Sequence, residues 1–138
     1  MSKTYYYGLY WYFYDDFEFI ELMHEKRFTE KEFKKMCDEA LRYAVKQLLK
    51  RKPEKDVFKI GFYHPDFMKL MVKYLEYKYG FKKLKYTAIA EYFGMTIIEE
   101  EDWKTGELEN FRKIVGEELL KKVLEHNKKV EEILENNL

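Results

Sequence analysis

The chain has 138 residues, of which 46% are hydrophobic, so it can bury one apolar core but is too short for two comfortable domains. Its 26 basic residues equal its 26 acidic residues, and binding to nucleic acid or an anionic membrane would therefore need a local patch. No apolar run approaches the roughly 20 residues of a membrane helix. We expect one domain over residues 1–138, in a soluble cytoplasmic protein.

The amino-acid composition is typical of proteins from organisms that grow at high temperature. Lys and Glu dominate the charged residues, while Gln47, Ser2 and Cys37 are the only residues of their types, a usage typical of hyperthermophiles. We therefore expect the source to be a heat-loving archaeon, or one of its viruses or plasmids. A single cysteine cannot form an internal disulfide, and the start lacks an aliphatic signal core, so export is not expected.

The run from Tyr5 to Tyr14 contains only aromatic residues and Leu, apart from Gly8. Aromatic side chains fit a pleated surface better than a helix, which predicts a strand with rings on both faces. Such a strand should be central or covered, because a bare apolar face would be an exposed patch. The rings could instead stack on a base or a planar ligand. After a turn at Asp15-Asp16, residues 17–22 are predicted to pair back as a hairpin.

Thr29 and Glu32 form a capping box, which predicts the start of a helix that Pro53 stops. Its apolar stripe recurs every three or four residues and comprises Phe33, Met36, Cys37, Ala40, Leu41, Ala44, Val45, Leu48 and Leu49. A short strand is expected over Asp56–Tyr63. His64-Pro65-Asp66 should then open a second helix, which Gly80 ends.

Alternation on both sides of Gly94 predicts one or two strands between Tyr86 and Glu99 that meet at this glycine. A C-terminal helix is predicted from Glu107 to about Glu135, with a kink or break at Gly116. The order of elements predicts an α+β fold. We expect a mixed or antiparallel sheet of four to five short strands, packed against two amphipathic helices plus the longer C-terminal helix.

His64 is the first candidate for chemistry, with Tyr63 before it and Asp66 two residues after it. A neutral imidazole near a carboxylate can act as a general base or bind a metal, and this predicts an enzyme of unknown chemistry as one alternative. The other interpretation is a helix start that His64 or Asp66 caps.

The remaining reactive residues favour no further site. His24, His64 and His126 are not spaced from one another or from Cys37 as metal ligands usually are, so neither a metal nor a cofactor is expected. Cys37 lies on the apolar stripe and should be a small core residue.

Lysines alternate with aromatic residues between Tyr77 and Tyr86. The ammonium groups of Lys78, Lys82, Lys83 and Lys85 could bind phosphates, while Tyr86 and the other rings stack on bases. This makes a nucleic-acid-binding module an alternative function, although the acids at 99–102 would repel the same ligand. The lysines could equally be a solvated helix end.

Two segments resemble known families. Ile89–Thr96 resembles the first helix and turn of a helix-turn-helix over residues 87–103, which implies DNA binding. The recognition helix would then carry four consecutive acids at 99–102, so strands are favoured here. Leu75–Lys82 resembles the late helix and following strand of acyl-CoA-dependent N-acetyltransferases. The chain lacks the glycine-rich loop that holds the cofactor pyrophosphate in that family.

The C-terminal helix carries a narrow apolar seam with one polar member, formed by Leu120, Val123, Asn127, Val130 and Leu134. Such a seam meets another helix, either within the chain or in a second subunit. We expect the second subunit, and thus a homodimer. The leading prediction is a non-enzymatic protein-interaction or scaffold module.

Overall fold

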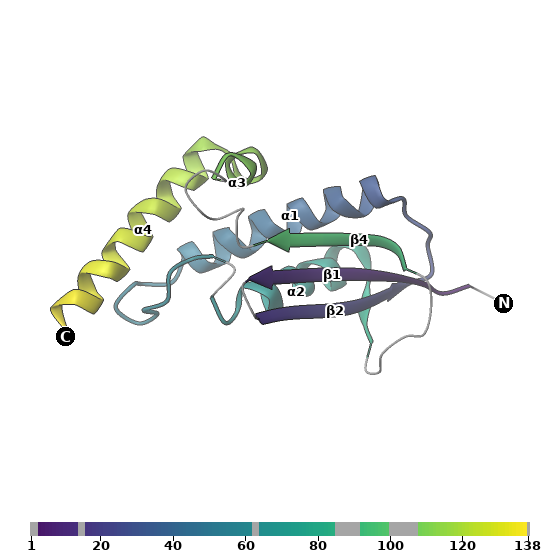
Figure 1. The fold of residues 1–138 in the computed structure, drawn as a ribbon, viewed down its shortest axis with the longest axis horizontal. Helices are drawn as coiled ribbons and strands as arrows, with labels where there is room; N and C mark the ends of the chain where they lie inside the picture. The colour runs from purple at the N-terminus through teal and green to yellow at the C-terminus, as the bar shows by residue number, and fades with distance from the viewer. Residues whose placement is uncertain (1–2, 14–15, 62–63, 85–91, 100–107, 138) are drawn as a thin grey trace.

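The computed structural model of the chain describes residues 3–13, 16–61, 64–84, 92–99 and 108–137. β1 (Tyr5–Phe13) pairs antiparallel with β2 (Asp16–His24), which confirms the hairpin. β4 (Tyr92–Glu99) pairs parallel with the other side of β1, and the short β3 (Lys82–Lys83) lies outside β2. The order β3-β2-β1-β4 makes β1 a central strand of an open mixed sheet (Figure 1). The predicted α+β class is confirmed.

α1 (Glu30–Leu49) begins at the predicted capping box. The Thr29 hydroxyl accepts the Glu32 backbone N–H at 3.1 Å, and the Glu32 carboxylate accepts the Thr29 backbone N–H at 3.3 Å. The predicted stripe is buried from Phe33 to Leu48. It packs closely on β4, because a Cβ on Gly94 would lie 3.0 Å from the Phe33 Cβ.

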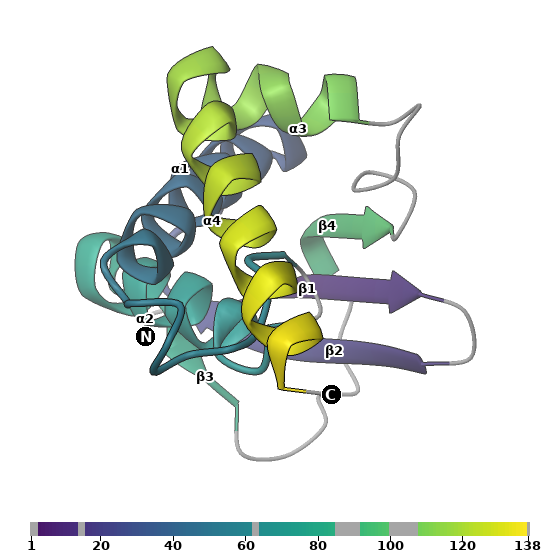
Figure 2. The ribbon, with the colours of Figure 1, turned by 90° about the vertical axis from the view of Figure 1, so that its left-hand side faces the viewer.

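α2 (Phe67–Tyr79) also lies where it was predicted. Its first N–H, from Phe67, donates to the His64 carbonyl at 3.1 Å. It ends at Gly80, whose φ of 77° is in the left-handed region that glycine adopts without strain. α1 and α2 pack together on one side of the sheet, behind the strands in Figure 1 and to their left in Figure 2.

The predicted C-terminal helix is divided by Gly116, which has a φ of 89°. α3 (Leu108–Val115) precedes this glycine and α4 (Glu117–Asn136) follows it, so the alternative of a break is confirmed. The expected start at Glu107 lies outside the described residues. The Arg42 guanidinium donates to the Ile114 carbonyl at 3.0 Å and so joins α3 to α1.

The strand predicted over Asp56–Tyr63 is wrong in its described part, residues 56–61, which form a loop. The Asn127 side chain of α4 accepts the Ile60 backbone N–H at 2.7 Å and donates to the Ile60 carbonyl at 3.2 Å. Both backbone groups that would bond a neighbouring strand are therefore used by one amide side chain.

The helix-turn-helix resemblance is also wrong where it can be compared with the structure. Residues 92–99 form β4 instead of a turn and a recognition helix, and residues 87–91 and 100–103 lie outside the described part. The predicted strand at Gly94 is confirmed. Its pairing with β1 shifts by one residue at Phe93, as in a β-bulge.

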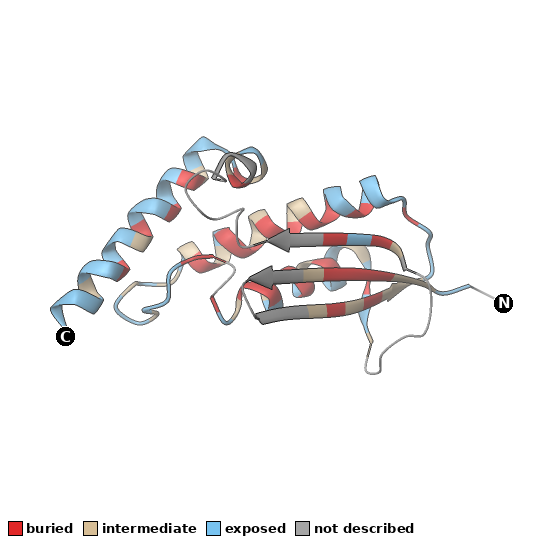
Figure 3. Cartoon of the chain, in the orientation of Figure 1, coloured by how far each residue is buried: buried red, intermediate tan, exposed pale blue. Residues whose placement is uncertain are grey.

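The core lies between the sheet and the helices α1 and α2, and it continues from α1 to buried residues of α3 and α4 (Figure 3). Tyr7 is fully buried at its centre, and its ring centroid lies 5.1 Å from Phe33 and 5.4 Å from Phe81. Its hydroxyl donates to the Lys26 carbonyl at 2.7 Å and accepts the Phe28 N–H at 2.6 Å. Among the described helices, none is both long enough and apolar enough to cross a bilayer.

Candidate functional site

An open cleft of about 540 Å³ lies between the end of α1 and the start of α2. It is lined by Lys50, Arg51, Lys52, Lys55, Asp56, Phe58, His64, Pro65 and Asp66. The sequence predicted His64 and Asp66 as a pair, and the structure places both of them here. The position of Tyr63 lies outside the described residues.

His64 is held by hydrogen bonds at both ring nitrogens. Its Nδ1 accepts the Asp66 backbone N–H at 3.1 Å, so Nε2 carries the ring proton and donates to an Asp56 carboxylate oxygen at 2.8 Å. The imidazole side chain is only 1% exposed. A general base needs a lone pair that faces its substrate, and this histidine offers none. The geometry favours a helix start organised by His64, which accepts the Asp66 N–H at Nδ1 and the Phe67 N–H at its carbonyl, whereas the Asp66 side chain makes no capping hydrogen bond.

Arg51 binds both carboxylates of the cleft. Its Nη1 lies 2.8 Å from Asp66 and 3.2 Å from Asp56. The hydrogen bond from Arg51 lowers the pKa of the Asp66 carboxyl. Burial raises the pKa of Asp56, but the hydrogen bonds from His64 and Arg51 outweigh it, and the net shift is downward. Both aspartates are thus held as carboxylates near neutral pH.

His126 of α4 lies close enough to this cluster to interact with it electrostatically. It is 8% exposed, and burial lowers the pKa of its imidazole while the Asp56 carboxylate acts in the opposite direction. Within the described residues, no three His, Cys, Asp or Glu side chains form a group that could hold a metal ion.

The lysines of the segment from Tyr77 to Tyr86 that the structure describes lie in different environments. Lys78 lies 3.5 Å from the Glu39 carboxylate and donates to the Tyr74 hydroxyl at 3.0 Å, so its charge is already matched. Lys82 and Lys83 are exposed on β3, at the edge of the sheet. Lys85 and Tyr86 lie outside the described residues. The structure does not gather the predicted lysines into one described patch.

Glu39 organises the surface beside Lys78. It accepts hydrogen bonds from the hydroxyls of Tyr79 and Tyr74. The bond from Tyr79 lowers the pKa of Glu39, and the same bond raises the pKa of Tyr79. Lys78 also lies over both rings, 5.4 and 5.5 Å from their centroids. These contacts stabilise the packing of α1 on α2 and leave Lys78 poorly placed for a phosphate.

The C-terminal seam packs mainly within the chain. Val123 and Val130 are 1% and 0% exposed, Leu120 is also buried, and Asn127 binds Ile60. Leu134 remains exposed. These residues contact the protein's own fold, which is the intramolecular alternative. A homodimer stays a prediction, and it needs another surface.

Cys37 lies in the core, as its place on the stripe predicts. Its side chain is 1% exposed, and burial raises the pKa of the thiol to about 12. A thiol so rarely ionised is neither a nucleophile nor readily alkylated.

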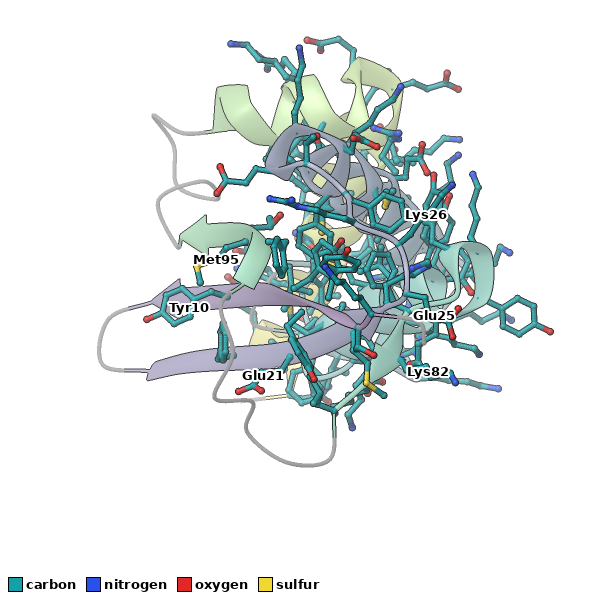
Figure 4. All side chains as sticks on the ribbon, turned by 90° about the vertical axis from the view of Figure 1, so that its right-hand side faces the viewer. Tyr10, Glu21, Glu25, Lys26, Lys82 and Met95 are labelled. Carbon is teal, nitrogen blue, oxygen red and sulfur yellow. The ribbon has the colours of Figure 1, made fainter. Side chains whose placement is uncertain are left out.

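One face of the sheet lies away from α1 and α2. Side chains alternate between the two faces of a strand, so Tyr7 and Leu9 face the helices while their neighbours Tyr6 and Tyr10 face outward. We call this outer surface the open face; its described members are Tyr6, Gly8, Tyr10, Phe19, Glu21, Met23 and Met95. Figure 1 looks onto it, and Figure 4 shows Tyr10 and Met95 extending away from the helices.

The open face is apolar and closely packed. The Tyr10 and Phe19 ring centroids are 6.2 Å apart. A Cβ on Gly8 would lie 2.8 Å from the Phe19 ring and 3.5 Å from the Met95 methyl group, so both side chains converge over this glycine. Met95 is 42% exposed, and Tyr6, Tyr10, Phe19 and Met23 are partly buried.

Sequence reasoning missed three residues of the cluster around His64. They are Asp56, which accepts a hydrogen bond from His64, Arg51, which binds both aspartates, and His126, which interacts with Asp56 and His64 through charge. No local pattern links them, because His126 comes from a helix 62 residues later in the chain. Comparison of the chain with known protein families, curated proteins and solved structures found no match.

Proposed function

We propose that this protein is a non-enzymatic interaction module that forms a homodimer through the open face. The observation that carries the proposal is an aromatic and methionine-rich sheet surface with no described helix over it. Contiguous apolar patches of this kind mark interaction sites. The polar cluster best placed for catalysis, around His64, is instead tied into the fold by hydrogen bonds.

The size of the open face suits a modest dimer. Three strands of about eight residues give a face about 27 Å long and about 14 Å wide, or roughly 400 Å² in projection. Protruding rings and methionines raise the accessible area above this value, towards the roughly 800 Å² that each partner buries in a standard interface.

Charge favours a second copy of the chain over a nucleic acid. Among the described open-face residues of β1, β2 and β4, Glu21 is the one that carries a charge, and a carboxylate there repels phosphate. Lys82 of β3 pairs with Met23 at the edge of this face, so a second copy can offer each of these charges an opposite one. Two copies of a chain with no net charge have no such overall repulsion. Aromatic residues and methionine are also enriched at protein interfaces.

Met95→Glu is expected to dissociate the dimer, because the contact would bury a carboxylate. The free monomer should tolerate the change, since Met95 is partly exposed. Sedimentation velocity over a concentration series measures the effect. Leu124→Glu is the matched control, because Leu124 is 50% exposed on α4, outside the open face.

A wild-type protein that stays monomeric at high concentration would overturn the proposal. Dissociation by Leu124→Glu alone would place the interface on α4 instead. Salt-dependent binding of a single-stranded oligonucleotide that Tyr10→Ala abolishes would assign the open face to nucleic acid.

A further inference from the structure

Three lysines surround the cleft beside His64 without an ion-pair partner in the described part of the chain. Lys50, Lys52 and Lys55 are exposed and line the cleft. Some exposed lysines are paired, as Lys34 is with Asp38 and Lys59 with Glu131, whereas these three lie together at one cleft. The cleft therefore has unmatched positive charge at its rim, in a chain whose total charge is zero.

The acids of the cleft do not cancel this charge. Asp66 is bound by Arg51, and Asp56 accepts hydrogen bonds from both Arg51 and His64. The Arg51 guanidinium offsets one of the two carboxylate charges, so the three lysines leave the lining of the cleft with a net positive charge. An anion at the rim would meet the three ammonium groups.

The lysines project from a loop with a defined backbone. The Lys55 and Asp56 N–H groups both donate to the Lys52 carbonyl, at 2.9 and 3.0 Å. Arg51 donates its N–H to the Leu48 carbonyl at 3.1 Å, which continues the last turn of α1. Fixing the backbone that carries the ammonium groups reduces the entropy lost when they bind a ligand.

An exposed ring stands at the same cleft. Phe58 is 54% exposed, and its ring centroid lies 5.8 Å from the His64 ring. A phenyl ring of this kind can stack on a planar group, while nearby ammonium groups bind phosphate oxygens. A volume of about 540 Å³ is within the range of small-molecule sites.

We propose that this cleft binds a nucleotide, with its phosphates on Lys50, Lys52 and Lys55 and its base against Phe58. The site is separate from the open face and does not depend on dimerisation. The same phosphate and base chemistry also occurs at the end of a nucleic-acid strand, so the test compares both sources.

Isothermal titration calorimetry of the whole chain with ATP, without added metal, is the test. Binding is expected to weaken as salt increases, because the contacts are ionic. The double variant Lys52→Ala/Lys55→Ala should lower the affinity by about tenfold or more, since two ammonium–phosphate contacts are lost. Lys121→Ala/Lys128→Ala on α4 is the matched control and should bind as the wild type does.

Two further ligands separate the parts of the proposal. Phe58→Ala should weaken ATP binding and leave tripolyphosphate binding unchanged, because only ATP has a base. A 5′-phosphorylated oligonucleotide that binds more tightly than ATP, with the same lysine dependence, would make the ligand a strand end. Absence of ATP binding, or ATP affinity equal in the Lys52→Ala/Lys55→Ala variant and the wild type, would overturn the site.

Discussion

Val130→Glu is expected to destabilise the folded chain by about 3 kcal/mol or more, because it buries an unpaired carboxylate. Val130 is 0% exposed within a single copy of the chain. Reversible denaturant melts at neutral pH measure the loss. Lys129→Glu is the matched control, since it adds the same side chain at the exposed neighbouring position and should change stability little.

This variant also decides where the C-terminal seam packs. A Val130→Glu protein that keeps the wild-type midpoint, yet loses its partner subunit in sedimentation, would show that the seam is an interface between copies. A lower midpoint with the control unchanged supports packing within the chain, as the bond of Asn127 to Ile60 indicates.

His64→Ala is expected to cost about 2 to 4 kcal/mol of stability. The substitution leaves a cavity where a nearly buried ring stood, and it leaves the Asp66 N–H without its acceptor. Asp56 also loses a donor to its carboxylate. Denaturant melts at neutral pH, where both aspartates are ionised, measure the effect.

Phe58→Ala is the control for His64→Ala, because it removes an exposed ring from the same loop and should cost much less. A His64→Ala protein as stable as the wild type would contradict the structural role. Such a result would make His64 a candidate catalytic residue again, because active-site residues are often not optimal for stability.

The elements that sequence reasoning predicted correctly carry their signals locally. The capping box places Thr29 and Glu32 three residues apart, and the stripe of α1 repeats within two turns. Gly80 and Gly116 end helices with a positive φ, which glycine adopts at little cost. In each case the physical cause lies within a few residues of its effect.

The wrong predictions depended on distant residues. Val57, Phe58 and Ile60 read as a strand, but the partner of the Ile60 backbone is Asn127, 67 residues away. The candidate site was predicted only in part for the same reason. His64 and Asp66 are close in sequence, whereas Arg51 comes from the end of the preceding helix and meets them only in the folded chain.

The rings on both faces of β1 predicted a strand that is central or covered. The structure makes it central, and the described helices cover one face. On the outer face, Tyr6 and Tyr10 keep the apolar character of a buried surface. The outer face thus has the residues of a buried surface, but no described helix packs on it. This is the basis of the proposed dimer.

The central claim is that a second copy covers the open face, and alkylation of a Met95→Cys variant tests it most directly. Cys37 should not react with the reagent, because it is buried and burial raises the pKa of its thiol to about 12. The alkylation rate of the thiol at residue 95 should fall severalfold as the protein concentration rises through the range in which the dimer forms. The thiol of a Leu124→Cys variant should be alkylated at the same rate at every concentration. A rate at residue 95 that is independent of concentration would contradict the account.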